Sequence, residues 1–253
     1  RAKRGKWAEA LDLPRKADTL YFAGCSPSLL LPELPRAAIE LLRKGGVEAA
    51  YLGADEVCCG APLLKIGEVQ LFEKVAAENV RRIRETGASR VITGCAGCFN
   101  ILSTYRDHVP DFDLEVSHSV QVVSELVDKG KLRFSRSSVS ATYHDPCDLG
   151  RLGGVFEEPR KILDSIPGLQ LSEMNFSRTS SVCCGSGGGV KTAYPRLAEF
   201  MGGRRVAEAV STGAESIVTA CPWCEQNFSD AIRAFHQEIQ VLDLIVLARD
   251  LAT

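Results

Sequence analysis

Ten cysteines divide this chain of 253 residues into two groups of five that share one internal spacing. Each group has a single cysteine, then 32 or 35 residues, a Cys-Cys-Gly triplet, and a Cys-x-x-Cys that is separated from the cysteine pair by 35 or 36 residues. The groups are Cys25, Cys58, Cys59, Cys95 and Cys98, and Cys147, Cys183, Cys184, Cys221 and Cys224. Matching cysteines lie 122 to 126 residues apart, and this regular offset indicates an internal duplication.

The sequence around the cysteines supports the duplication. Thr-Gly-Ala-Ser-Arg-Val-Ile-Thr-Gly-Cys at 86–95 aligns with Thr-Gly-Ala-Glu-Ser-Ile-Val-Thr-Ala-Cys at 212–221. Val-Cys-Cys-Gly at 57–60 is identical to 182–185. We therefore treat the chain as two halves, each with one group of five cysteines.

Short apolar runs alternate with longer segments of helical periodicity in both halves. The pattern predicts strands over 19–22, 47–52, 90–93, 139–143, 169–174 and 216–219. It predicts helices over 33–43, 67–85, 119–127, 159–165, 194–211 and 239–251. This alternation predicts an α/β fold of two duplicated halves, each a small and mostly parallel sheet with flanking helices.

Four of the cysteines follow predicted strands directly. Cys25, Cys95, Cys147 and Cys221 come one to four residues after a strand. Ligands of parallel α/β sheets collect at the carboxyl ends of the strands. We therefore expect the thiols of each half to meet at one edge of its sheet and to form a metal-binding centre there.

The overall composition narrows the class of protein. Apolar residues make up 45% and charged residues 25%, and the formal net charge is −2, so nothing indicates a nucleic-acid partner. No apolar stretch reaches the length of a membrane span, and no export signal is present. These features predict a cytoplasmic location, with any association to a membrane complex made through partner subunits.

Disulfides and zinc are the simpler interpretations of ten cysteines. Neighbouring cysteines such as Cys58 and Cys59 form strained bridges, and no secretory signal suggests an oxidising compartment. Structural zinc takes four ligands, commonly from two Cys-x-x-Cys pairs, whereas each half offers five cysteines and one such pair. Adjacent side chains splay apart, which suits two metal atoms of one cluster. A zinc-stabilised interaction module remains an alternative.

An iron–sulfur centre is the stronger interpretation, because thiolates are the usual ligands of such clusters. Five cysteines exceed the four that an ordinary cubane needs, and the spacing differs from the compact run of bacterial ferredoxins. The residues alone thus indicate an unusual thiolate-rich centre without naming its type.

The repeated motif resembles the duplicated cysteine-rich CCG domain of heterodisulfide reductases, where it occurs in their B and D components. It is also similar to iron–sulfur subunits of glycolate and lactate oxidases and of sulfate-reducer membrane complexes. The likeness extends over about 19–231 and includes Tyr-His-Asp-Pro-Cys-Asp at 143–148. Family members commonly have histidine where this chain has Asp148, which leaves the cysteines intact but bears on what surrounds them.

The resemblance implies one [4Fe-4S] cluster of non-cubane type in each half, held by its five cysteines. It implies a redox enzyme that reduces a disulfide, or oxidises two thiols, between the clusters. It also implies redox partners: a ferredoxin-like module, a flavoprotein or a cytochrome b-type membrane subunit. A relay without its own substrate, serving a 2-hydroxy-acid dehydrogenase or a quinone-linked complex, is the alternative.

The domain organisation follows from the motifs. We expect an N-terminal extension at 1–18, a first CCG domain at 19–128, a linker at 129–138 and a second CCG domain at 139–253. The chain begins with Arg1 and a basic segment, which suits a fragment that follows a ferredoxin-like module.

Several residues near the cysteines are further candidates. His144 is the candidate catalytic proton donor, since imidazole titrates near neutrality, and His118 is expected to be structural. Gly60 and Gly185 are expected to allow a turn that brings backbone N–H groups toward the centre. Lys65 is interpreted as a solvated lysine. Trp223 is expected to shield the second centre from water, while Ala-Gly at 96–97 leaves the first more open.

Overall fold

Two parallel β-sheets, one in each half, organise the chain. The computed structural model describes residues 3–253, so Arg1 and Ala2 of the expected N-terminal extension lie outside the described residues. The first sheet contains β1 (Thr19–Tyr21), β2 (Arg90–Thr93) and β3 (Glu115–His118) in the order β1-β2-β3. All of its strand pairs are parallel, as the alternating pattern predicts.

The second sheet repeats this arrangement with one more strand. It contains β4 (Ser140–His144), β5 (Gln170–Leu171), β6 (Ser216–Thr219) and β7 (Gln240–Asp243) in the parallel order β5-β4-β6-β7. When the two halves are aligned by their cysteines, β1 corresponds to β4, β2 to β6 and β3 to β7. The predicted α/β fold with two duplicated parallel sheets is therefore confirmed.

Helices connect the strands in both halves. The first half contains α1 (Cys25–Leu30), α2 (Glu33–Lys44), α3 (Ala61–Lys65), α4 (Val69–Glu85), α5 (Ala96–Thr104) and α6 (Ser119–Asp128). The second half contains α7 (Glu157–Asp164), α8 (Val190–Ala193), α9 (Pro195–Ser211), α10 (Pro222–Phe235) and α11 (Leu244–Leu251). Short 3-10 helices are η1 (Lys6–Ala8), η2 (Gly53–Asp55), η3 (Tyr105–Asp107) and η4 (Arg178–Ser180).

The end of the chain differs from the prediction of one helix over 239–251. Residues Gln240–Asp243 form β7, which pairs with β6, and only Leu244–Leu251 is helical. The Asp243 carboxylate accepts hydrogen bonds from the N–H groups of Ile245 and Val246 and so begins the helix. In the first half, His118 ends β3 and caps α6 through the N–H of Val120 in the same way.

The predicted strand over 47–52 was also wrong. Only Ala50 pairs with the sheet, through one isolated parallel bridge to Leu20. The next residue, Tyr51, donates its N–H to the carbonyl of Pro14 rather than to β1, and η2 follows at Gly53. In a parallel ladder the next rung would join Leu52 to Ala23. The N–H of Ala23 instead donates to the Glu56 carboxylate, and the Leu52 carbonyl accepts from Arg15. In the second half, the predicted strand over 169–174 is reduced to the two residues of β5.

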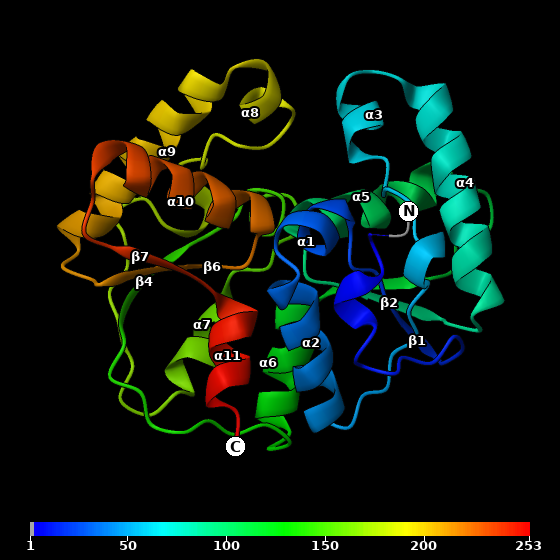
Figure 1. Ribbon diagram of the computed structural model, residues 1–253, viewed down its shortest axis with the longest axis horizontal. Coiled ribbons are helices and arrows are strands. Elements are labelled where there is room, and N and C mark those ends of the chain that lie inside the picture. The colour runs from blue at the N-terminus through cyan, green and yellow to red at the C-terminus, as the bar shows by residue number, and fades with distance from the viewer. Residues whose placement is uncertain (1–2) are drawn as a thin grey trace.

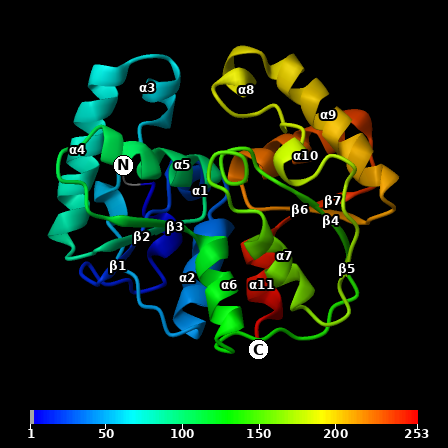
Figure 2. The same cartoon turned by 180° about the vertical axis from the view of Figure 1, so that it is seen from behind.

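Four helices fill the space between the sheets and join the halves. Helix α2 packs against α11, and α6 packs against α7, so each pair combines one helix from each half. Figures 1 and 2 show these four helices side by side in the centre of the molecule, while α3–α4 and α8–α9 stand on opposite sides of its other end. The halves are therefore packed against each other at one end and separated at the other.

Segments outside the two cysteine motifs are packed rather than loose. In the expected linker, Leu132 and Phe134 are buried, and Phe134 forms an antiparallel bridge with Ala252. In the N-terminal segment, the Trp7 ring is 2% exposed and its centroid lies 4.7 Å from that of Tyr51. Over residues 3–253, the helices are too short or too polar to cross a membrane.

Candidate metal centres and the cavity between them

The carboxyl ends of the strands deliver the cysteines to one edge of each sheet. After β1, Cys25 begins α1; after β2, Cys95 forms the N-terminal cap of α5. After β6, Cys221 caps α10, with Pro222 at its first position, and Cys147 follows three residues after β4. The cysteine pairs come from loops that precede α3 and α8. Three separated segments thus meet in each half, as the strand pattern predicts.

The thiols of each half lie close enough to share one centre. The Sγ atoms of Cys59 and Cys98 are 3.5 Å apart in the first half, and those of Cys184 and Cys224 are 3.2 Å apart in the second. Both distances are well above the ~2.05 Å of a disulfide bond, and all ten cysteines are free. The thiol clusters are therefore available as metal ligands.

A glycine turn shapes each cysteine pair in the same way. Gly60 and Gly185 have φ values of +86° and +89°, and each donates its N–H to the first cysteine of the pair, at 3.4 Å from Cys58 Sγ and Cys183 Sγ. The expected turn, with its N–H directed to sulfur, is confirmed in both halves. A side chain at Gly185 would place Cβ 2.5 Å from that of Met201, so the turn also requires a bare backbone.

Hydrogen bonds between thiols shift the pKa values within each cluster. In the first half, the hydrogen bond with Cys58 lowers the pKa of Cys59 to about 5. The hydrogen bond with Cys59 raises the pKa of Cys98 well above its ordinary value. In the second half, the hydrogen bond between Cys147 and Cys183 lowers the pKa of Cys183 to about 2 and raises that of Cys147. The hydrogen bond with Cys224 also lowers the pKa of Cys221. Each cluster therefore has at least one thiol that readily becomes the thiolate that metals bind.

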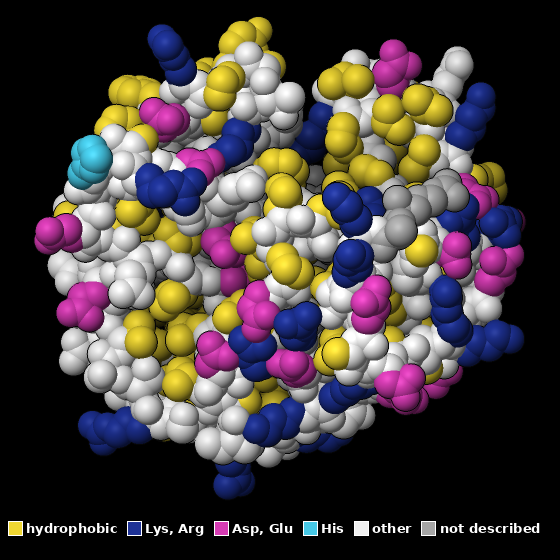
Figure 3. All heavy atoms as spheres, viewed as in Figure 1, with side chains coloured by type: hydrophobic (Ala, Val, Ile, Leu, Met, Phe, Trp, Pro, Cys, Tyr) yellow, Lys and Arg dark blue, Asp and Glu magenta, His cyan; other side chains and the backbone are white. Residues whose placement is uncertain are grey.

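Both groups of thiols open onto one cavity of about 220 Å³ between the halves. Every cysteine except Cys183 lines it, and the hollow between the two lobes is visible in Figure 3. The other lining residues are mainly small or apolar, including Pro62, Ile66, Pro146 and Gly187–Gly189. A ligand in this cavity would reach the thiols of both halves at once.

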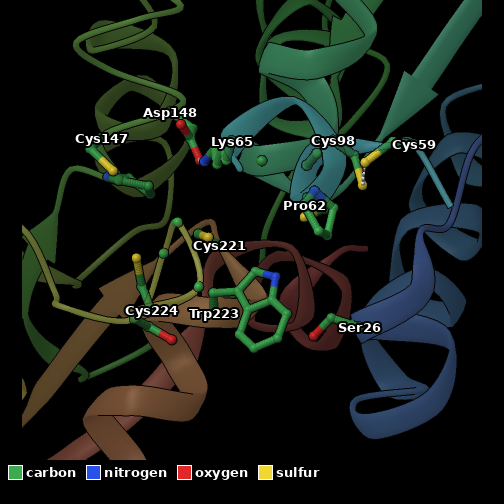
Figure 4. A pocket seen from close by; sticks show the side chains of 18 of the residues that line it. Ser26, Cys59, Pro62, Lys65, Cys98, Cys147, Asp148, Cys221, Trp223 and Cys224 are labelled. Carbon is green, nitrogen blue, oxygen red and sulfur yellow. Dashed lines mark hydrogen bonds and ion pairs between the residues drawn. The ribbon is translucent and has the colours of Figure 1, made fainter. Parts of the chain in front are cut away.

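One ion pair crosses the cavity. Lys65 Nζ lies 3.4 Å from Asp148 Oδ2, and the two side chains point toward each other in Figure 4. Lys65 belongs to α3 in the first half and Asp148 follows Cys147 in the second. Lys65 is an exposed lysine, as expected, and in addition it lines the cavity and has a partner in the second half.

Trp223 has a wider role than the sequence indicated. Its side chain lines the cavity and packs against the apolar clusters of both halves, including those around Cys98 and Cys224. Figure 4 shows its indole ring projecting between the labelled cysteines. Gly97 occupies the matching position in the first half and also lines the cavity, so a single tryptophan covers the region between both clusters.

His144 lies behind the second cluster and does not line the cavity. It is 1% exposed, and burial, followed by the charge of Arg205, lowers its pKa well below the usual value. One ring nitrogen lies within 4.8 Å of the Sγ atoms of Cys184 and Cys224. Burial thus favours the neutral imidazole, and the ring does not line the cavity. Burial also lowers the pKa of His118 to about 3, in keeping with its structural role at α6.

Glu56 is a buried residue near the first cluster that the sequence did not single out. Its carboxylate accepts the N–H groups of Ala23 at 2.8 Å and Gly24 at 3.0 Å, which lead directly into Cys25. Arg4 lies 3.5 Å from the same carboxylate. Burial raises the pKa of Glu56 to about 7. Its position two residues before the cysteine pair is the only signal that the sequence offered.

The donors around the thiols fit a bound centre that carries acceptor sulfurs. Ser26 Oγ, Ser186 Oγ and His144 Nε2 are buried and find no hydrogen-bond partner within residues 3–253. Ser26 and Ser186 also line the cavity. Buried polar groups normally have partners, and five thiols beside such donors are the surroundings that an iron–sulfur cluster requires.

The fold and the clustered thiols define a duplicated α/β protein with one group of five free cysteines in each half. The cysteine-rich domain family, CCG, matches residues 19–103 and 141–229. The chain belongs to this family and contains two copies of its domain.

Relatives with known names include several components of oxidoreductases. The chain is 38% identical over 241 residues to the D component of dihydromethanophenazine:CoB–CoM heterodisulfide reductase from Methanosarcina barkeri, with 93% of this chain and 59% of the relative covered. It is 35% identical to the B component of fumarate reductase (CoM/CoB) from Methanothermobacter marburgensis, with 84% and 42% covered. It is 30% identical to EtfAB:quinone oxidoreductase of Syntrophomonas wolfei, with 88% and 32% covered. The chain thus spans 59% or less of these relatives.

A solved structure supports the fold independently. The crystal structure of a hypothetical protein from Helicobacter pylori superposes with a TM-score of 0.71 at 13% identity, covering 93% of this chain and 49% of that chain. At this level of identity the likeness concerns the fold alone.

Proposed function

We propose that the chain is an iron–sulfur redox module with one [4Fe-4S] cluster of non-cubane type in each half. The observation that carries the proposal is that five free thiols, from three separated segments, meet at the sheet edge in both halves, and that all of them except Cys183 line one cavity. Family membership and the names of the relatives support an iron–sulfur role. The ligands are Cys25, Cys58, Cys59, Cys95 and Cys98 in the first half, and Cys147, Cys183, Cys184, Cys221 and Cys224 in the second.

We further propose that the module acts on a disulfide held between the two clusters. Reduction of a disulfide consumes two electrons and two protons, breaks the S–S bond and yields two thiols; oxidation of two thiols is the reverse. Bound clusters would supply the electrons and the iron sites that sulfur prefers. The shared cavity supports this proposal because it exposes one substrate to both sets of cysteines.

The residues of the cavity have distinct roles in this proposal. The cysteines hold the clusters, and Trp223 excludes water from the space between them. Lys65 and Asp148 hold the two sides of the cavity together through their ion pair. We do not assign proton donation to His144, because it lies behind the cysteines and its pKa is lowered by burial.

Electrons would come from a partner. Candidate donors are a ferredoxin-like module, a flavoprotein or a membrane protein of the cytochrome b type.

We also propose a division of the chain into domains. It has an extension at 1–18, CCG domains at 19–128 and 139–253, and a linker at 129–138.

A pure electron relay is the second candidate function. Two relatives, a fumarate reductase and a quinone oxidoreductase, have names that refer to acceptors other than a disulfide, and these names favour the relay. In a relay, both clusters would pass electrons without binding a substrate thiol.

Metal analysis of the anaerobically purified chain tests the assignment of clusters. We expect about eight irons and about eight acid-labile sulfides per chain, and about half of each in Cys59→Ala and in Cys184→Ala. One or two zinc ions without sulfide would replace the proposal with a zinc-stabilised interaction module.

Thiol titration separates the enzyme from the relay. An EPR signal that changes when thiol is added under oxidising conditions indicates a substrate-binding cluster. A signal that is indifferent to thiol, with full iron content, indicates a relay.

A further inference from the structure

The two halves differ at a pair of buried positions behind the cysteines. His144, at the end of β4, corresponds to Phe22, which follows β1, since Tyr143 and Tyr21 precede them at the same offset as Cys147 and Cys25. Arg205 in α9 corresponds to Asn79 in α4, because the two helices have equal lengths and an offset of 126 residues. All four side chains are fully buried. The second half therefore has an imidazole and a guanidinium where the first has a phenyl ring and an amide.

Arg205 fixes the tautomer of His144. Its Nε donates to His144 Nδ1 at 3.1 Å, and it also pairs with Glu208 and donates to Ser181 Oγ. An arginine in a protein is always protonated and can only donate. Nδ1 must therefore be the acceptor, and in the neutral ring the proton is on Nε2.

The Nε2–H group is a buried donor that lacks an acceptor in the described part of the chain. The ring is held edge-on to Phe228, at 4.8 Å between centroids and 89° between planes. One of its nitrogens lies within 4.8 Å of the sulfurs of Cys184 and Cys224. Since Nδ1 is occupied by Arg205, the remaining donor is available to the sulfur of a centre bound by these cysteines.

The first half offers no equivalent donor among the described residues at this face. Phe22 has no polar atom, and Asn79 donates instead to the carbonyl of Cys58 and to Tyr105. The N–H groups of Ala23 and Gly24, next to Cys25, are both taken by Glu56. Pro146, which corresponds to Gly24, has no N–H, so the free donor that distinguishes the second half at this face is His144.

We propose that His144, held by Arg205, is a positioning residue that donates its Nε2–H to a sulfur of the second centre and raises its reduction potential above that of the first. This inference rests on the proposed function, because it requires an iron–sulfur centre in the second half. A hydrogen bond to sulfur stabilises the added negative charge of the reduced state. When a one-electron donor reduces the chain, the donor loses one electron, the second centre gains it, and His144 keeps its proton.

A redox titration followed by EPR tests the inference in the chain of 253 residues. Cys59→Ala serves as the background, so that only the second centre is observed, and His144→Phe copies the first half. We expect about a tenfold smaller ratio of reduced to oxidised centre at a fixed potential, which equals about 59 mV for one electron. His144→Gln, which retains an N–H donor, should recover part of the shift, and Arg205→Met should produce part of it.

The matched control is Phe22→Leu in a Cys184→Ala background, where we expect the potential of the first centre to stay unchanged. Iron and sulfide content separates a failure of the proposed function from a failure of the inference about His144. Absence of iron and sulfide in the unmutated chain overturns the proposed function itself. Normal iron content in His144→Phe with an unchanged potential overturns only the inference about His144.

A second measurement covers the case in which His144→Phe fails to bind the centre. Pulsed EPR of the Cys59→Ala chain labelled with ¹⁵N-histidine should show one histidine nitrogen and one exchangeable proton coupled to the second centre. Their absence would contradict the proposed hydrogen bond without any substitution at His144.

Discussion

Lys65 Nζ lies 3.4 Å from Asp148 Oδ2, and this ion pair connects the two halves across the cavity that their cysteines share. The side chains are 31% and 14% exposed, so water screens the interaction in part. We expect a double-mutant cycle with Lys65→Met and Asp148→Asn to give a coupling of about 0.5–1 kcal/mol in the free energy of unfolding. Urea denaturation of the four chains measures it.

The pair between Arg15 and Asp55 is the matched control. Its atoms are 3.3 Å apart, but both side chains are 65% exposed and belong to the same half. We expect no measurable coupling there. Equal coupling in the two pairs would show that the position across the cavity adds nothing.

The glycine of the second cysteine pair gives a packing prediction. Gly185→Ala must adopt a φ near +89° and place Cβ 2.5 Å from that of Met201 and 3.1 Å from the carbonyl oxygen of Ala198. The backbone conformation costs about 1–2 kcal/mol, and the overlap adds roughly 1–3 kcal/mol. Denaturant unfolding should therefore show a loss larger than the backbone cost alone.

Gly213→Ala separates these two contributions. Gly213 has a φ of +77°, and no atom lies within 4 Å of a Cβ built on it. We expect only the backbone cost of about 1–2 kcal/mol in this variant. If Gly185→Ala cost no more than Gly213→Ala, close packing against α9 would not be the reason for the glycine.

Trp7 tests whether the N-terminal segment stabilises the first half. The ring is 2% exposed, packs beside Tyr21 and Tyr51, and donates to the Tyr51 hydroxyl at 3.0 Å. Trp7→Ala should lower the free energy of unfolding by about 3–5 kcal/mol, as for other large buried rings. Phe176→Ala, at a ring that is 54% exposed, should change it by about 0.5 kcal/mol or less. Similar small losses in both variants would indicate a detachable extension.

Asp243 gives a prediction for pH dependence. Burial raises its pKa to about 7, and Glu225, Tyr21 and Tyr143 are titratable groups that interact with it. The ordinary pKa of the unfolded chain is near 3.8. Its contribution to stability is therefore complete below about pH 4 and is lost as the pH rises through about 7.

Asp243→Asn removes this titration and keeps an oxygen that can cap α11. We expect the variant to exceed the unmutated chain in stability at pH 8 by on the order of 2 kcal/mol, and by less at pH 5. Unfolding in urea at both pH values gives the comparison. A variant that is less stable at pH 8 would show that the charged cap outweighs the cost of burial.

The cysteine pattern predicted much of this architecture because its physics is local. A strand that is followed by a cysteine places this cysteine at the carboxyl end of a parallel sheet. A glycine after a cysteine pair indicates a turn. The helices over 33–43, 67–85 and 194–211 agree closely with α2, α4 and α9 for the same reason. Features that depend on the packing of distant segments were not accessible in this way.

Three residues illustrate that limit. The pairing of Ala50 with β1 does not continue to Leu52, because the Leu52 carbonyl accepts from Arg15, a residue far away in sequence. Lys65 meets a partner from the other half, and the buried hydrogen bond of His144 comes from Arg205, 61 residues further along. Each depends on the way the duplicated halves pack, which periodicity does not encode.

Trp223 gives the last prediction, because one side chain packs against the apolar clusters of both halves. Trp223→Ala should admit water to both centres, since the apolar surroundings of a metal site control solvent access. We expect iron release in air to become several-fold faster in both the Cys59→Ala and the Cys184→Ala backgrounds. Trp223→Phe should retain most of the protection. Faster release from the second centre alone would mean that the tryptophan shields only its own half, as the sequence had suggested.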